Sequence, residues 1–185
     1  MTSRLALTGL ALALPIAAVS FAVFEGLTAV LSCLLGWTMA TIAVSDARQF
    51  IIPDELSLPA IPVGIVAAGL TATQSDPDQA VLQHAASAVL TGLAFYCLAW
   101  AFRVVRGRDG LGLGDVKLAA AAGAWTGWSG VTLVVLCACL GAICFAIYLH
   151  LVRGRGVSRT TMIPFGAFLA PSTWLVWSAL MLASA

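Results

Sequence analysis

The 185-residue chain is 61% hydrophobic and only 9% charged, and its mean hydropathy is +1.02. Soluble domains carry about 25% charged residues, so this composition excludes an ordinary water-soluble protein and indicates that the chain is solvated by a lipid bilayer. Nine Lys and Arg residues against eight Asp and Glu residues give a formal net charge of +1, which leaves no basic field to attract nucleic acid.

Seven stretches with few or no charges follow one another along the chain, and each is near the roughly 20 residues that a spanning helix needs. They cover residues 5–24, 27–45, 56–73, 81–102, 111–128, 131–152 and 163–183. The first stretch follows Arg4 as a signal peptide would, but it is longer than the apolar part of a typical signal peptide and lacks a clear cleavage pattern. We therefore predict an all-α, polytopic transmembrane bundle of about 6–7 spanning helices.

The basic residues predict how this bundle is oriented. All nine flank the stretches at alternate ends, so they fall on one side of the predicted membrane protein. They are Arg4, Arg48, Arg103, Arg106, Arg108, Lys117, Arg153, Arg155 and Arg159. Because Lys and Arg are enriched in cytoplasmic loops, the N-terminus is expected in the cytoplasm.

The fifth stretch places one carboxylate at a membrane boundary. Residues 118–128 alone would rise only about 17 Å, too little to cross the hydrocarbon, so this helix must begin before Lys117. That requirement draws Asp115 to the cytoplasmic edge of the hydrocarbon. An ionisable group there is costly and is by default a functional-site candidate.

Asp46 is predicted at the same membrane face, because the second stretch is free of charges and is followed directly by Asp46. The two aspartates are 69 positions apart, so only helix packing can bring them together. Paired carboxylates that share one proton suit peptide hydrolysis. The ionised carboxylate takes a proton from water while the protonated one polarises the scissile carbonyl.

Four segments resemble the motifs of one family. Gly112-Leu113-Gly114-Asp115-Val116-Lys117-Leu118 is similar to the Gly-x-Gly-Asp motif of the type IV prepilin peptidases, which are intramembrane aspartic peptidases. The first motif of that family, an Asp seven residues before a Pro that is followed by Asp or Asn, is similar to the run from Asp46 to Asp54. Residues 124–127 and Ile163-Pro164-Phe165-Gly166 resemble two further landmarks, in the same order.

The resemblance implies a function and a set of site residues. Asp46 and Asp115 are the expected catalytic pair. The expected substrate-contacting or structural motif residues are Gly112, Gly114, Lys117, Pro53, Asp54, Pro164, Phe165 and Gly166. The implied reaction is removal of the short basic leader from type IV pilin-like precursors at the cytoplasmic face of the bacterial inner membrane, with no metal and no cofactor. Residues 1–185 are then expected to form a single membrane-embedded peptidase domain, with an extra helix at 1–24 and the core at 27–183.

Two departures from the family pattern refine this expectation. Long members have a cytoplasmic domain with paired Cys-x-x-Cys motifs and also methylate the new N-terminus, whereas only Glu25-Gly26 separates the first two stretches here. We therefore expect a short form without methyltransferase activity, resembling the peptidases of tight-adherence (Flp-type) pili. The position after Phe165-Gly166, often Pro in the family, is Ala167.

Several of these residues also have simpler interpretations. Asp54 is expected to cap the N-terminus of the third helix. Lys117 is expected to extend to the lipid headgroups, with an influence on the ionisation of Asp115 as the alternative. Pro164-Phe165-Gly166 is expected to start or break a helix, and Asp46 alone can be read as a polar helix end that pairs with Arg48.

Two other classes of protein remain open at this point. A small transporter or channel subunit can use paired intramembrane carboxylates for protons or cations, although no half-to-half repeat supports it. A non-catalytic assembly protein of a pilus or secretion system would use the aspartates only to fix helix register. The sequence makes no prediction of the oligomeric state.

Overall fold

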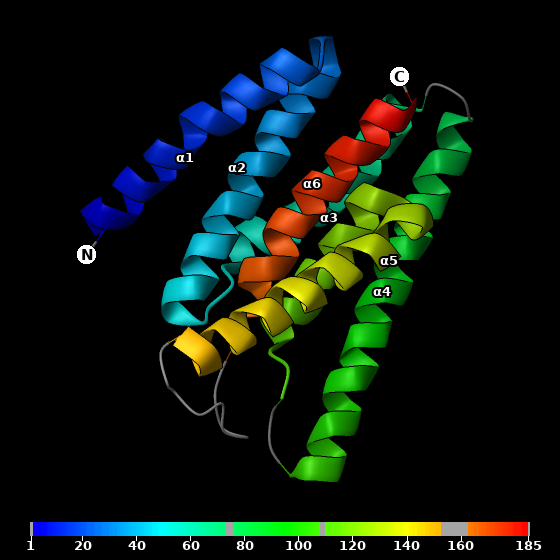
Figure 1. Cartoon of the computed structure of the whole chain (residues 1–185). Coiled ribbons are helices and arrows are strands. Elements are labelled where there is room, and N and C mark those ends of the chain that lie inside the picture. The colour runs from blue at the N-terminus through cyan, green and yellow to red at the C-terminus, as the bar shows by residue number, and fades with distance from the viewer. Residues whose placement is uncertain (1, 73–75, 108–109, 153–162, 185) are drawn as a thin grey trace.

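The computed structural model describes residues 2–72, 76–107, 110–152 and 163–184, with only the backbone described for residues 2–12. Six helices make up this part of the chain, which contains no strand, so the all-α prediction is confirmed (Figure 1). The helices are α1 (Thr2–Val23), α2 (Gly26–Gln49), α3 (Asp54–Leu70), α4 (Pro77–Arg106), α5 (Leu113–Val152) and α6 (Gly166–Ser184).

Four of these helices, namely α2, α4, α5 and α6, are long and apolar enough to cross a membrane. A multi-pass membrane protein is therefore supported by the length and composition of its helices. Helix α3 has 17 residues, includes Pro59 and Pro62, and is not among these four. The finer count of 6–7 spanning helices stays a prediction.

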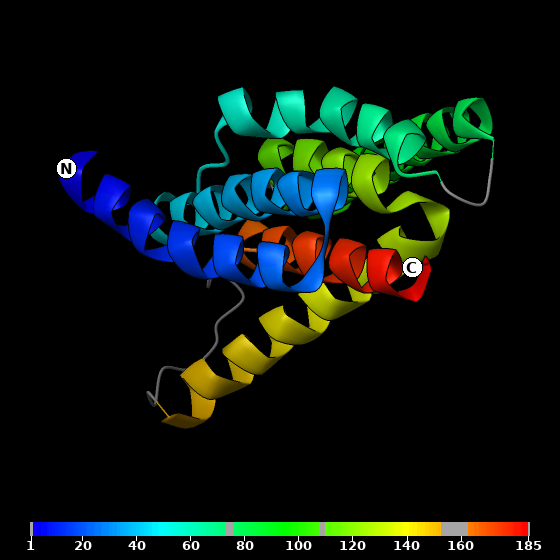
Figure 2. The same ribbon diagram turned by 90° about the horizontal axis from the view of Figure 1, so that it is seen from above.

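Helix α5 contains two of the predicted stretches as two arms. The chain reverses its direction between the arms, at Gly127 (Figures 1 and 2). Gly127 has φ 60° and ψ −167°, a backbone conformation that is essentially restricted to glycine. The first arm of α5 begins at Leu113, so the prediction that this helix starts before Lys117 is confirmed. The reversal returns the second arm to the end of the bundle from which the first arm started.

His84 of α4 supports this reversal from the neighbouring helix. A sharp kink interrupts the regular hydrogen bonding of a helix, and freed carbonyls need another donor. The Nδ1 atom of His84 lies 2.8 Å from the carbonyl oxygen of Ala124, in position to donate to it. This bond ties α4 to the last turn before Gly127 and gives His84 a structural role.

The first arm of α5 lies inside the bundle, with α3 and α4 on one side and α2 and α6 on the other (Figure 2). Small residues allow this close packing, as is usual between membrane helices. A Cβ at Gly123 would lie 2.7 Å from the carbonyl oxygen of Ser87 in α4. At the end of the arm, the buried ring of Trp125 packs edge-on against Trp177 of α6 at 5.6 Å and donates a hydrogen bond to the Ala60 carbonyl of α3.

The last turns of α2 and α4 and the first turns of α3, α5 and α6 gather at one end of the bundle, at the bottom of Figure 1, which we call the motif end. Arg48, Arg103 and Arg106 occupy the last turns of α2 and α4, and Lys117 lies near the start of α5. These four basic residues share one end, as predicted. The remaining basic residues predicted on this side, namely Arg108, Arg153, Arg155 and Arg159, lie outside the described residues, and only the backbone of Arg4 is described.

We predict that Gly127→Ala lowers the free energy of unfolding by about 1–3 kcal/mol, because alanine rarely adopts this backbone conformation. Its Cβ would also lie 3.0 Å from Nε2 of His84. Thermal unfolding in detergent measures the change. Gly107→Ala is the matched control, since Gly107 also has a positive φ but a Cβ there meets no atom within 4 Å, and it should cost less. Equal losses from the two variants would contradict this account of the reversal.

Candidate active site

Asp46 lies in the last turn of α2, and its carboxylate is bound by the beginning of α6. The side chain is 5% exposed, and its Oδ2 accepts a 2.8 Å hydrogen bond from the backbone N–H of Ala167. The backbone amide of Gly166 also interacts with this carboxylate. Gly166 and Ala167 are the first two residues of α6, where backbone N–H groups have no partner inside the helix and the helix dipole favours an anion. The buried carboxylate therefore receives hydrogen bonds, and the N–H groups at the helix start receive an acceptor.

Asp115 is the third residue of α5, and its carboxylate interacts with the backbone at the start of the same helix. Its backbone N–H donates to the carbonyl of Gly112 at 3.1 Å, and the backbone amide of Gly112 interacts with its carboxylate. The contact with the Gly112 amide corresponds to the half of a capping box in which a side chain in the first turn reaches back to the N–H before the helix. Among the described residues, the buried Oδ1 atom of Asp115 has no hydrogen-bond partner. The hydrogen-bonding capacity of that oxygen is therefore unused within the described residues.

The two carboxylates are close enough to interact electrostatically, although they come from different helices. The sequence prediction that helix packing places Asp46 and Asp115 together is therefore supported by the geometry at the motif end. Two like charges in a partly buried site are most stable when they hold a proton between them. Such a pair can accept a proton from water at one oxygen and donate one at another.

Ile52 lies between the glycines that adjoin the two aspartates. A Cβ at Gly114 would lie 3.0 Å from Ile52 Cβ. A Cβ at Gly166 would lie 2.7 Å from Ile52 Cδ1 and 3.0 Å from Asp46 Oδ2. A side chain at either position would displace Ile52, and at position 166 also the carboxylate. Close approach of backbone to neighbouring side chains thus explains both motif glycines.

The connection from α2 to α3 places Ile52 in this gap. Phe50 ends α2 in the left-handed conformation, with φ 55°, and its N–H donates to the carbonyl of Asp46. The Ser45 hydroxyl donates to the carbonyl of Ile51 at 2.8 Å. Pro53 then occupies the position before the first residue of α3, where its fixed φ is favourable. The connection is therefore fixed at both ends and in the middle.

The predicted capping role of Asp54 is corrected by the structure, which also shows an ion pair between Asp54 and Lys117. Pro53, not Asp54, is the N-cap of α3, and no side-chain cap bond forms there. Asp54 is instead the first residue of the helix, and both of its carboxylate oxygens accept from Lys117 Nζ, at 2.7 and 2.8 Å. Lys117 therefore binds Asp54, a pairing that the sequence did not predict. The pair is partly exposed, with side-chain exposures of 34% for Lys117 and 55% for Asp54, so it contributes little to stability.

Pro164, Phe165 and Gly166 mark the start of α6, so the expected helix start is confirmed. The carbonyl of Phe165 accepts from the N–H groups of Phe168 and Leu169, which begins the helical hydrogen bonding. The Phe165 ring packs against Phe95 of α4 at 6.3 Å. These contacts fix the first turn of α6, and that turn presents its N–H groups to Asp46.

Two contributors to the site escaped the sequence analysis. Ile52 was part of a recognised motif but was not predicted to be a site residue, because nothing in its local pattern indicates contact with residues 114 and 166. Ala167 was noted only as a departure from proline, yet its N–H binds Asp46. A proline has no N–H, so this chain makes a bond that proline at this position cannot make.

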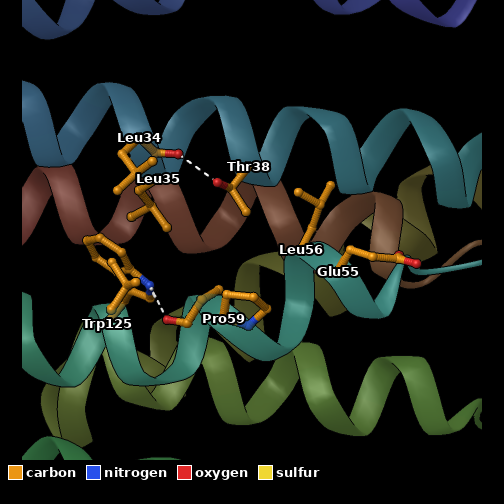
Figure 3. A pocket seen from close by; sticks show the side chains of 9 residues that line it. Leu34, Leu35, Thr38, Glu55, Leu56, Pro59 and Trp125 are labelled. Carbon is orange, nitrogen blue, oxygen red and sulfur yellow. Dashed lines mark hydrogen bonds between the residues drawn. The ribbon is translucent and has the colours of Figure 1, made fainter.

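A cavity between two of these helices is separate from the carboxylate pair. It has a volume of about 120 Å³ and lies between α2 and α3, with Trp125 at one end and Glu55 at the other (Figure 3). None of the predicted site residues lines it. In the described part of the chain, no group of three His, Cys, Asp or Glu side chains is arranged to hold a metal ion.

A polytopic helical bundle with two carboxylates held together at one end defines a membrane protein with a paired-acid centre. The chain belongs to the type IV leader peptidase family, whose model matches residues 33–147 and so includes both aspartates. No solved structure matches the chain at a significant level.

Curated relatives agree with this family. The chain is 32% identical over 179 residues to a prepilin leader peptidase/N-methyltransferase of Aeromonas hydrophila, covering 96% of this chain and 59% of the relative. It is 38% identical to the protein of that name in Pseudomonas aeruginosa, over 78% of this chain and 48% of the relative. The Escherichia coli K12 protein of that name is 37% identical over 70% of this chain and 54% of its own length. The chain thus spans about half to three fifths of these relatives.

We predict that Ala167→Pro destabilises the folded chain by about 1–2 kcal/mol, because it removes the N–H that binds Asp46 while proline remains acceptable in the first turn of a helix. Thermal unfolding in detergent measures this loss. Ala167→Ser is the matched control because it changes the side chain and keeps the N–H. If both variants unfold at the same temperature, the hydrogen bond to Asp46 does not contribute to stability.

Proposed function

We propose that this chain is an aspartic endopeptidase that removes the leader from type IV pilin-like precursors at the cytoplasmic face of the bacterial inner membrane. Membership of the type IV leader peptidase family supports the substrate class. The observation that carries the proposal is the meeting of Asp46 and Asp115 at the motif end, each bound by backbone amides at a helix start. This arrangement matches the needs of acid–base hydrolysis of a peptide bond.

In the proposed mechanism, Asp46 and Asp115 share one proton before the substrate binds. The ionised carboxylate takes a proton from a water molecule, which attacks the carbonyl carbon of the scissile bond. The protonated carboxylate donates to the carbonyl oxygen, and the resulting tetrahedral intermediate expels the amine of the mature N-terminus after that amine is protonated. The unpartnered Oδ1 of Asp115 is a suitable contact for the water or the carbonyl oxygen.

We infer that the peptidase half of the relatives' name applies to this chain and that the methyltransferase half does not. The paired carboxylates supply hydrolysis, whereas methyl transfer was expected from a cysteine-containing domain between the first two helices, and here α1 and α2 are separated only by Phe24 and Glu25. We further propose one peptidase unit, with α1 as an addition to the core that begins at α2. Its partners are then pilin-like precursors and the lipid bilayer.

The test of the proposed function is co-expression with candidate pilin-like precursors, followed by intact-mass measurement of the product. We predict a product shortened at a leader boundary and without an added methyl group. Asp46→Asn and Asp115→Asn should each abolish cleavage, and the double variant should be no worse than either, because groups that act as a unit do not contribute additively. Asp78→Asn is the control and should retain full activity, since Asp78 is an exposed residue in the first turn of α4, away from the motif end.

The same assay gives a pH dependence whose direction follows from the shared proton. Activity should fall at high pH, where the pair loses its proton, and also at low pH, where the second carboxylate becomes protonated. The fall in activity at high pH and the fall at low pH both report titration of the pair, and neither can be assigned to one residue. Full cleavage by Asp46→Asn or Asp115→Asn would exclude the dyad, and a methylated product would exclude the inference on the transferase half.

We also propose that the motif end faces the cytoplasm, because basic residues gather there. The two ends of the 30-residue helix α4 provide the test. In a chain whose native cysteines are replaced, Gly107→Cys should react with a membrane-impermeant thiol reagent only in inverted vesicles. Asp76→Cys should react only from the outer side of intact cells. The opposite labelling pattern would reverse the proposed orientation.

A further inference from the structure

The connection between α2 and α3 contributes one side chain that touches both halves of the carboxylate centre. Ile52 is partly buried and packs against the hydrophobic core. Its Cβ faces Gly114, the residue directly before Asp115, and its Cδ1 faces Gly166, where α6 begins to bind Asp46. One side chain therefore separates the backbone of α5 from the backbone of α6 where these two helices begin.

We propose that Ile52 is a positioning residue that sets the separation of Asp46 and Asp115. This inference rests on the proposed peptidase function, and it assigns to Ile52 no contact with the substrate. The two glycines allow α5 and α6 to approach until they meet the isoleucine, and the isoleucine stops them. The volume of a single side chain then fixes the distance between the two bound carboxylates.

Three contacts hold Ile52 where this role requires it. On its N-terminal side, the N–H of Phe50 donates to the Asp46 carbonyl and the Ser45 hydroxyl donates to the Ile51 carbonyl. On its C-terminal side, Asp54 binds Lys117, two residues beyond Asp115. The connection is thus attached to the helix of Asp46 at one end and to the helix of Asp115 at the other. A spacer needs such attachment, because a mobile side chain would not define a distance.

The physical consequence concerns catalysis more than folding. Reacting groups must be held to within a fraction of an ångström, and a misplacement of 1 Å can cost about a hundredfold in rate. Removing Cδ1 of Ile52 leaves a gap on the Gly166 side, so α6 and the attached Asp46 can shift. Substrate binding elsewhere is unaffected by that shift. The expected signature is therefore a fall in kcat with an almost unchanged KM.

The first experiment compares Ile52→Val with Ile61→Val in the cleavage assay, using a precursor that the unaltered protein processes. Ile61 is a matched control because it lies on α3 and packs against the same core, but it is not among the atoms nearest to Gly114 or Gly166. We expect Ile52→Val to lower kcat by about tenfold with KM changed by less than about twofold, and Ile61→Val to change neither by more than about twofold. Thermal unfolding should shift similarly in both variants.

The second experiment uses the two glycines, because they differ in which atom of Ile52 lies nearest to an added Cβ. Gly166→Ala meets Cδ1 at 2.7 Å, and Ile52→Val removes that atom, so the combination should recover part of the activity that Gly166→Ala loses. Recovery should be incomplete, because Asp46 Oδ2 remains 3.0 Å from the new methyl group. Gly114→Ala meets Cβ at 3.0 Å, which valine retains, so Ile52→Val should not rescue it.

The outcomes separate this inference from the proposed function. If the unaltered chain cleaves its precursor but Ile52→Val behaves like Ile61→Val, or rescues both glycine variants equally, the positioning role is wrong and the peptidase proposal stands. If the unaltered chain cleaves no precursor, both are wrong. Ile52→Val deletes a single methyl group, so the comparison does not depend on a variant that fails to fold.

Discussion

The binding of the Asp46 carboxylate by the first turn of α6 is the contact on which the rest of the site depends. A buried carboxylate near the end of α2 is unfavourable by itself, and the N–H groups that open α6 equally need acceptors. The hydrogen bond between the Asp46 carboxylate and the first turn of α6 supplies the partner that each group needs. The contact also connects residues that are 121 positions apart, so it fixes how α6 lies against α2.

Asp115 is held by the same physical principle within its own helix, because it stands in the first turn of α5 and interacts with the amide of Gly112. Both carboxylates therefore lie at helix N-termini, that of Asp46 at the start of α6 and that of Asp115 at the start of α5, where the backbone supplies hydrogen bonds and a favourable dipole without another charged residue. Once both helix starts bind a carboxylate, the spacing of those starts determines the spacing of the acids. This is why the glycines at 114 and 166 and the volume of Ile52 matter to function.

The sequence predicted the parts of this arrangement that depend on hydropathy and on local motifs. Uninterrupted apolar stretches indicated the helices, and the depth argument for Asp115 correctly required α5 to begin before Lys117. The pairing of Lys117 with Asp54 was not predictable, because these residues are 63 positions apart and each has a plausible local role. The sandwiched position of Ile52 depends likewise on the packing of three segments, and no periodicity of its own segment encodes that. The same holds for Gly127, whose conformation shows only in the folded chain.

The central claim is that folding brings the side chains of Asp46 and Asp115 together at one end of the bundle. The direct measurement is thiol cross-linking of Asp46→Cys with Asp115→Cys in native membranes, in a chain whose five natural cysteines are replaced by alanine. Asp46→Cys with Gly107→Cys is the comparison, because Gly107 follows α4 at the same end of the bundle. We predict that a short bifunctional reagent joins the first pair rapidly and the second pair poorly. Cross-linking of the aspartate positions no faster than of the comparison pair would contradict the account.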